Sequence, residues 1–509
     1  MNLTIGDRPL NFGHLRDAWE RDVTVNIGTE ARSRIARSRD EVERVVATGR
    51  QVYGLNTGFG QLAQVRIGDR ELSRLQENLV RSHAVGVGPL LPDAVVRLTL
   101  VTKAAALAQG YSGVRMELVE ALCALLENRI YPCIPAKGSV GASGDLAPLA
   151  HMAGALLGIG DVQVDGQRLP AANALAAAGL PLLTLAPKEG LALLNGTQVS
   201  TALAIAALLR AENLLGAALA AGALCVDAIR GSDTPFDPRI QQVRGHAGQA
   251  AVAERLLELM RGSEIRAAHF DCGRVQDPYS IRCQPQVVGA CLDVMRHVAG
   301  VLCTEANAVT DNPLVFSDGG DVLSGGNFHA EPVALAADYL ALAIAEIGAL
   351  SERRVALLID SHLSGLPAFL VEHSGLNSGF MMAQVTAAAL ASENKSLAHP
   401  ASVDSIPTSA NQEDHVSMAT AAAYRLHAML DNTSHIVAVE LLAAAQGVDF
   451  HRPQKSSPSL ERVMERVRAV SPRYTTDRSL STDIADVAGM IDSGTFREFA
   501  NALLPGTAG

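Results

Sequence analysis

Charged residues are scarce in this chain of 509 residues, at 19%, whereas hydrophobic residues make up 48%. A chain with so few charges and so many apolar side chains can bury a large core, which excludes an intrinsically disordered protein. Basic residues are also in deficit, with 42 against 53 acidic residues and a net charge of −11. Because such a surface repels phosphate backbones, nucleic acid is not expected as a partner.

Cysteine pairs and metal-ligand spacings are lacking as well. The seven cysteines include no CxxC motif, which favours reduced thiols in the cytoplasm over a disulfide framework or a zinc cluster. The 14 histidines include no HExxH spacing, and we therefore predict no metal site. The N-terminal segment has no basic stretch that leads into an apolar one, so no targeting signal is expected.

The most apolar stretches, residues 199–228 and 335–350, contain charged side chains. We interpret them as buried helices and expect no contact with a membrane. Alanine and leucine, which are strong helix formers, dominate these and other long segments and predict a mainly α fold. In residues 331–360, apolar residues recur at steps of four, three and three, on one face of a helix: Leu340, Ile344, Ile347 and Leu350. Further helices are expected at 92–109, 113–129, 186–230, 284–310, 380–398 and 414–447.

Helices of this length usually pack side by side as a bundle. We therefore expect a long central helical bundle with C-terminal helices over residues 201–509, and a smaller N-terminal part over residues 1–200. Short hairpins are expected at residues 162–169 and 313–323, where Asp-Gly pairs provide the turns.

A glycine-rich segment at residues 138–148, GSVGASGDLAP, is the most unusual part of the N-terminal region. It has none of the phosphate-loop, dinucleotide-binding or nucleophile-elbow spacings. By itself the segment favours a turn before a helix capped by Asp145. A chemical interpretation also exists, because the nitrogen of Gly144 could approach the Ala142 carbonyl if the loop bends tightly around Ser143.

Seven segments in collinear order resemble the histidine ammonia-lyases: YGLNTGFG, ASGDLAPLAH, GLALLNGTQ, QDPYSIRCQPQ, DNPLVF, GGNFHAEP and NQEDHVSM. The resemblance extends from about residue 23 to residue 446. It implies that Ala142, Ser143 and Gly144 cyclise with loss of two waters to 4-methylideneimidazol-5-one (MIO), so that no external cofactor is needed. Elimination of ammonia from an amino acid needs such an electrophile, because ordinary side chains are not electrophilic enough. Whether the substrate's amine or its imidazole adds to this group stays open.

The resemblance also implies roles for two tyrosines. Tyr279 is implied to be the general base that removes the β-proton, and Tyr53 to take part in proton transfer. On the residues alone, either tyrosine could simply anchor its loop. Arg282 is implied to bind the substrate carboxylate through its planar guanidinium, and Asn195 to contact the amino or carboxylate group.

Four further residues are implied to line the pocket. Gln276 would form hydrogen bonds and Phe328 an apolar wall. His83 and Glu413 would lie at the end that receives the substrate ring, where a carboxylate can accept a hydrogen bond from imidazole N–H. Residues Ser82, His83 and Glu413 favour histidine, because the phenylalanine and tyrosine lyases differ there.

The resemblance thus implies an enzyme that converts L-histidine to trans-urocanate and ammonia, the first step of histidine degradation. It also implies a homotetramer with sites shared between chains, and the apolar composition agrees with such burial. The alternatives are a tyrosine or phenylalanine ammonia-lyase, an aminomutase, and a helical assembly protein without activity. The intact Ala142-Ser143-Gly144 sequence argues against the last of these.

Overall fold

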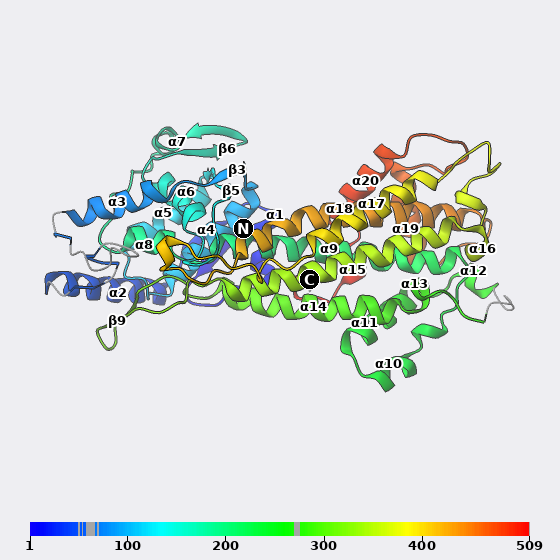
Figure 1. Ribbon diagram of the computed structural model, residues 1–509, viewed down its shortest axis with the longest axis horizontal. Coiled ribbons are helices and arrows are strands. Elements are labelled where there is room, and N and C mark those ends of the chain that lie inside the picture. The colour runs from blue at the N-terminus through cyan, green and yellow to red at the C-terminus, as the bar shows by residue number, and fades with distance from the viewer. Residues whose placement is uncertain (49–50, 53, 58–66, 69–70, 269–274, 508–509) are drawn as a thin grey trace. The chain divides into compact units, whose positions relative to one another are not determined.

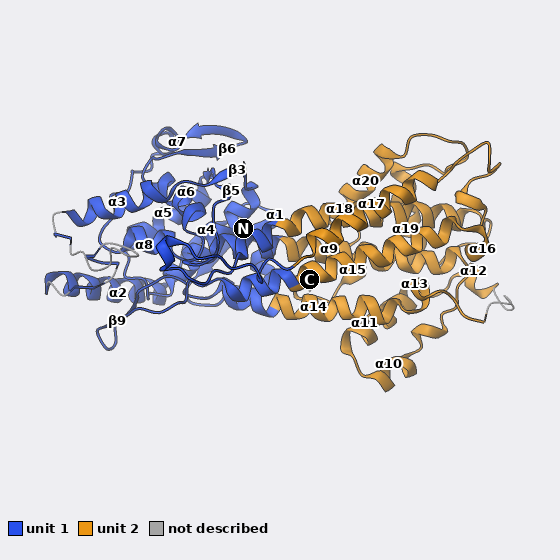
Figure 2. Ribbon diagram, viewed as in Figure 1, with its two compact units in different colours: residues 1–206, 300–338, 400–424 blue, residues 207–299, 339–399, 425–509 orange. Residues whose placement is uncertain are grey.

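The computed structural model describes residues 1–48, 51–52, 54–57, 67–68, 71–268 and 275–507. The chain divides into two compact units, each assembled from three segments of sequence (Figure 2). Unit 1 comprises residues 1–206, 300–338 and 400–424, and unit 2 comprises residues 207–299, 339–399 and 425–509. The domain boundary expected after residue 200 stays a prediction.

Helices are the main regular secondary structure of unit 1 (Figure 1). They are α1 (Phe12–Glu20), α2 (Thr29–Ala47), α3 (Leu72–His83), α4 (Asp93–Ala108), α5 (Met116–Glu127), α6 (Leu146–Leu156), α7 (Ala171–Ala177) and α8 (Glu189–Leu194). Every residue of α4 from Val95 onward is buried, as expected for a helix that is apolar on all sides. The helices predicted at 92–109 and 113–129 are confirmed as α4 and α5.

Short strands connect these helices. β1 (Asn2–Ile5) pairs in parallel with β2 (Thr24–Ile27), and β3 (Val87–Leu90) pairs antiparallel with β5 (Pro135–Lys137). β4 (Tyr131–Pro132), β6 (Asp161–Val164) and β7 (Gln167–Pro170) form a three-stranded sheet, while β8 (Leu314–Phe316) pairs with β9 (Asp321–Leu323). Both predicted hairpins are confirmed, and β6 and β7 turn at Asp165 and Gly166, which have positive φ.

Unit 2 holds most of the length of four long helices, α9 (Gln198–Ala228), α14 (Gln284–Ala306), α15 (Glu331–Ile359) and α18 (Ala419–Asp449). Buried polar contacts join three of them. The guanidinium of Arg354 on α15 donates to the carboxylate of Glu440 on α18, and the thiol of Cys225 on α9 donates to the same carboxylate at 3.2 Å. The predicted mainly α fold with a long-helix bundle is confirmed.

The smaller elements of unit 2 are α10 (Pro238–Arg244), α11 (Ala247–Met260), α12 (Glu264–Ala267), α13 (Tyr279–Arg282), α16 (Ser361–Ser364), α17 (Met381–Leu397), α19 (Pro458–Val470) and α20 (Ser481–Asp492). By length and composition alone, α9, α14 and α15 could cross a membrane. The most apolar window of α9 is 94% buried within the protein, so the core accounts for its hydrophobicity.

The continuous helix predicted at 186–230 is wrong. The chain leaves α8 after Leu194 and enters α9 at Gln198. Gly196 between them has a φ of +139°, a conformation that side-chain-bearing residues rarely adopt. The break exposes the backbone of residues 195–197 to contacts with the glycine-rich segment.

Candidate active site

The loop of residues 138–145, called the ASG loop below, joins β5 to α6 within unit 1. Gly144 has a φ of +71° and forms a single β-bridge with Gly196. The next residue, Asp145, donates its backbone N–H to the Gly196 carbonyl at 2.7 Å. A Cβ at position 144 would collide with the backbone of Gly196. Glycine is therefore needed at position 144 both for its φ and for this close approach.

The buried carboxylate of Asp145 holds the C-terminal end of the ASG loop. It accepts hydrogen bonds from the Ser139 hydroxyl at 3.0 Å, from the Thr420 hydroxyl at 2.5 Å, and from the N–H and hydroxyl of Ser200 at 2.7 and 2.9 Å. Ser200 lies in the first turn of α9, where a negative charge is favoured. Asp145 is the N-cap residue of α6, as expected, but its side chain makes no cap hydrogen bond to that helix.

Two other segments hold the N-terminal half of the ASG loop. Ala330 donates its N–H to the Gly141 carbonyl at 3.2 Å, and the Ser417 hydroxyl donates to the same carbonyl at 3.0 Å. Met418 donates its N–H to the Val140 carbonyl at 2.8 Å. The loop is thus attached to residues that lie far from it in sequence.

Ser143 contacts two of the residues implied by the resemblance. Nδ2 of Asn195 donates to the Ser143 carbonyl oxygen at 2.7 Å, and the Ser143 hydroxyl donates to Oε1 of Glu413 at 2.6 Å. The other carboxylate oxygen of Glu413 accepts from the Thr408 hydroxyl at 2.6 Å. Glu413 precedes α18, which begins at Ala419 and not at residue 414 as predicted.

The buried amine of Lys103 binds the backbone where the chain passes from α8 to α9, beside Ser143. Its Nζ donates to the carbonyls of Ala192 and Asn195 at 2.9 and 2.8 Å. Burial lowers the pKa of Lys103 to about 7, although the nearby charge of Asp311 opposes this shift. Asp311 in turn pairs with the buried amine of Lys188 at 2.6 Å. Sequence reasoning missed Lys103, although a lysine in the middle of an apolar helix is a recognisable signal.

His83 and Glu413 are the residues predicted to select the substrate ring, and the charge of Glu413 acts on His83. His83 ends α3 and is half-buried. Burial lowers the pKa of His83, while a backbone hydrogen bond at Leu79 and the charge of Glu413 oppose the shift. Phe328 is half-buried in the turn before α15. Within unit 1 the structure thus brings Asn195 and Glu413 into contact with Ser143, and places His83 close enough to Glu413 to feel its charge.

Gln276, Tyr279 and Arg282 belong to unit 2. Tyr279 and Arg282 begin and end the single turn α13, and the guanidinium carbon lies 4.6 Å from the centre of the Tyr279 ring. Tyr279 is 70% exposed. Nε of Arg282 is buried and has no hydrogen-bond partner among the described residues. Tyr53 lies outside the described residues.

The chain is also similar to known proteins in sequence and structure. The aromatic amino acid lyase family matches residues 10–469. The chain belongs to this family. It is therefore a carbon–nitrogen lyase.

Curated relatives of this chain are named histidine ammonia-lyase. The protein of Aromatoleum aromaticum is 61% identical over 91% of this chain and 88% of its own. That of Vibrio cholerae is 56% identical over 99% of both chains. Among solved structures, histidine ammonia-lyase from Trypanosoma cruzi superposes with a TM-score of 0.91 at 41% identity, covering 99% of this chain and 96% of that one. A tyrosine aminomutase from Streptomyces globisporus gives 0.93 at 36% identity, with 98% of both chains covered.

Proposed function

We propose that this chain is a histidine ammonia-lyase, which eliminates ammonia from L-histidine without oxidation and yields trans-urocanate. The observation that carries the proposal is the Glu413 carboxylate, which lies 2.6 Å from the Ser143 hydroxyl. An acceptor for imidazole N–H thus stands beside the residue that would provide the electrophile. The names of the relatives at 61% and 56% identity agree with histidine as the substrate.

Ala142, Ser143 and Gly144 would form the MIO group, whose methylene carbon is an electrophile that no ordinary side chain provides. The residues present fit this group. Gly144 has the left-handed φ of a tightly bent backbone, and the space where its Cβ would stand is filled by Gly196. The Ser143 carbonyl, which the ring would retain, already has a donor in Asn195. Asp145 fixes the end of the loop through four hydrogen bonds.

The side-chain chemistry of the other site residues is the basis of their proposed roles. Arg282 would bind the substrate carboxylate, and its buried Nε without a partner among the described residues is the kind of donor that such a ligand satisfies. Tyr279 would accept the β-proton as the C–N bond breaks, with Tyr53 assisting proton transfer. His83 and Glu413 would hold the imidazole, while Gln276 and Phe328 would complete the pocket.

The proposed enzyme is a cytoplasmic homotetramer that acts at the first step of histidine degradation and assembles each site from more than one chain. Large apolar side chains are exposed on one face of α15, at Leu335, Tyr339 and Leu342. These positions follow each other at helical spacing, and such a stripe is typical of a surface that another chain covers.

A substrate panel tests the proposal. Purified protein is incubated separately with L-histidine, L-tyrosine and L-phenylalanine, and the products are separated by chromatography. We expect urocanate and ammonia from histidine at a specificity constant at least about 100-fold above those for the other two, because only imidazole can donate a hydrogen bond to the half-buried carboxylate of Glu413. A cinnamate product formed preferentially would favour the phenylalanine or tyrosine lyase. A β-amino acid product would favour the aminomutase.

A further inference from the structure

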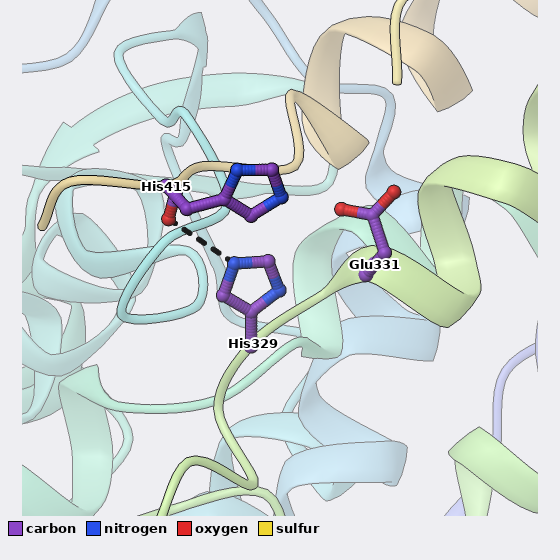
Figure 3. A group of neighbouring side chains, drawn as sticks. All are labelled: His329, Glu331 and His415. Carbon is purple, nitrogen blue, oxygen red and sulfur yellow. Dashed lines mark hydrogen bonds between the residues drawn. The ribbon is translucent and has the colours of Figure 1, made fainter. Parts of the chain in front are cut away.

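We infer that His329, Glu331 and His415 form a binding site for one divalent transition-metal ion of the zinc class. One ligand atom from each of the three residues lies within 4.8 Å of the others, all within unit 1. Figure 3 shows the two imidazole rings beside each other and the carboxylate turned toward them. Two imidazoles and one carboxylate are a ligand set that zinc uses where it keeps a fourth position open for water.

The ligand spacing fits an ion after small side-chain movements. Ligand atoms around a tetrahedral zinc are roughly 3.4 Å apart, given bonds of about 2.0 to 2.2 Å. The ligand atoms of the present cluster lie within 4.8 Å of one another. Side-chain rotations that move each ligand atom by about 1 Å would therefore bring them to bonding distance of one ion. The two rings are nearly parallel, at 8°, with their centres 5.7 Å apart. Figure 3 shows one nitrogen of each ring on the side of Glu331.

Glu331 provides an independent sign of a missing partner. Its Oε2 atom is buried and accepts no hydrogen bond from any described residue. Glu331 is the first residue of α15, but a favourable helix dipole does not replace a direct partner for a buried oxygen. A cation between this oxygen and the two imidazoles would satisfy it.

Each histidine already has one ring nitrogen engaged, as metal-binding histidines usually do. Nε2 of His329 lies 3.2 Å from the backbone carbonyl of His415, to which it can donate. Nδ1 of His415 lies 3.3 Å from the hydroxyl of Ser405, which itself accepts the N–H of Val416 at 2.9 Å. With these bonds formed, Nδ1 of His329 and Nε2 of His415 stay available for the ion.

The position of this site would allow the ion to stabilise the ASG loop. Ala330, between two of the ligands, and Ser417, two residues after the third, both donate to the Gly141 carbonyl. An ion bound by His329, Glu331 and His415 would therefore tie together the two segments that hold the ASG loop. Sequence reasoning predicted no metal site, because His415 lies 86 residues from His329 and no local spacing connects them.

Metal binding is the direct test, and its readout does not depend on catalysis. Protein without a histidine tag is stripped with a chelator, titrated with Co²⁺ under visible absorption, and dialysed against Zn²⁺ for elemental analysis. We expect one tightly bound ion per chain and the intense visible bands of tetrahedral Co²⁺. The variants His329→Ala and His415→Ala should bind at least about 100-fold more weakly, since loss of a ligand costs more than the 10- to 100-fold of an outer partner.

Two further variants exclude a folding artefact. Glu331→Gln keeps the shape of the side chain and should weaken binding while the circular dichroism spectrum stays unchanged. Ser405→Ala removes the hydroxyl beside Nδ1 of His415, together with the acceptor of the Val416 N–H, and should cost about 10- to 100-fold in affinity. The control is His246→Ala, at an exposed histidine whose side chain makes no cap hydrogen bond, and it should bind as the wild type does.

Equal stoichiometry and affinity in the wild type and in the folded His329→Ala and His415→Ala variants would overturn the inference, as would no binding by the wild type. Because the titration works equally well in a Ser143→Ala background, it separates this inference from the proposed function. An inactive protein that binds the ion supports the metal site alone.

Discussion

The Ser143 hydroxyl donates a hydrogen bond of 2.6 Å to Oε1 of Glu413, a residue 270 positions later in the chain. Conversion of Ser143 to the MIO group would remove this hydroxyl and leave Oε1 without its donor. The oxygen would then be available to an imidazole N–H, while Thr408 continues to hold the other carboxylate oxygen. This contact therefore connects the proposed electrophile with the proposed recognition of the substrate ring.

Replacement of Glu413 by alanine should harm histidine far more than phenylalanine. A hydrogen bond to a charged, partly buried group contributes about 2 kcal/mol, or roughly 30-fold in the specificity constant. The measurement is the specificity constant for each substrate, with the near-ultraviolet spectrum recorded to verify that the cofactor has formed. Equal losses on both substrates, in protein that contains the cofactor, would remove Glu413 from ring recognition.

Gly144→Ala should prevent formation of the cofactor. Alanine at this position must adopt a φ of +71°, and its Cβ would collide with the backbone of Gly196. Gly179 is a matched control, because it has a φ of +68° but no neighbouring atom near the position of a Cβ. Gly179→Ala should lose about 1 kcal/mol of stability and keep its activity. Near-ultraviolet difference spectra after addition of cyanide compare the cofactor content, and equal content in both variants would contradict the steric argument.

Lys103 should make the free energy of unfolding depend on pH. Its pKa is about 7 in the folded protein and 10.5 when unperturbed. Between these values the unfolded chain binds the proton that the folded chain has lost, so the contribution of Lys103 to stability rises with pH from about 7 to 10.5 and is lowest below pH 7.

Denaturant unfolding of the wild type and of Lys103→Met at pH 6 and pH 9 measures this effect. The stability of the wild type relative to the variant should be greater at pH 9 than at pH 6. Lys395→Met, at an exposed lysine of α17, serves as the control and should show no such change. An equal difference at both pH values for Lys103→Met would mean that its amine keeps an ordinary pKa.

If each active site is built from more than one chain, two different inactive variants should restore activity when they assemble together. Ser143→Ala lacks the electrophile and Arg282→Ala lacks the proposed carboxylate ligand, so each should be nearly inactive alone. When the two are co-expressed, mixed tetramers contain some sites with an intact Ser143 from one chain and an intact Arg282 from another. The measurement is histidine turnover by purified mixed tetramers. No recovered activity would place both residues in sites built by a single chain, or the carboxylate elsewhere.

Local patterns in the sequence were sufficient to predict several helices and hairpins. The apolar runs of α4 and α5 and the Asp-Gly turn between β6 and β7 depend on neighbouring residues, and these predictions are confirmed. The break between α8 and α9 was missed, although the polar segment of residues 195–198, NGTQ, interrupts the run of Leu and Ala. It depends on tertiary contacts, such as those from the Lys103 amine to the Ala192 and Asn195 carbonyls.

The candidate site shows the same limit. A short motif identifies the Ala142-Ser143-Gly144 tripeptide, but the partners of the neighbouring Asp145 come from residues 139, 200 and 420. No local spacing predicts such a convergence. For the same reason sequence reasoning found His83 and Glu413 only through the family resemblance, and it did not connect His329 with His415.

The most direct test of the account is the reaction of the purified protein with L-histidine, measured in parallel for the wild type and Ser143→Ala. Urocanate is followed by its near-ultraviolet absorbance, and ammonia is assayed in the same samples. We predict one ammonia per urocanate from the wild type, and a fall of several orders of magnitude in Ser143→Ala, which has no hydroxyl to eliminate. A folded Ser143→Ala protein that keeps more than a few per cent of the wild-type rate, or a wild type that forms no urocanate, would contradict the account.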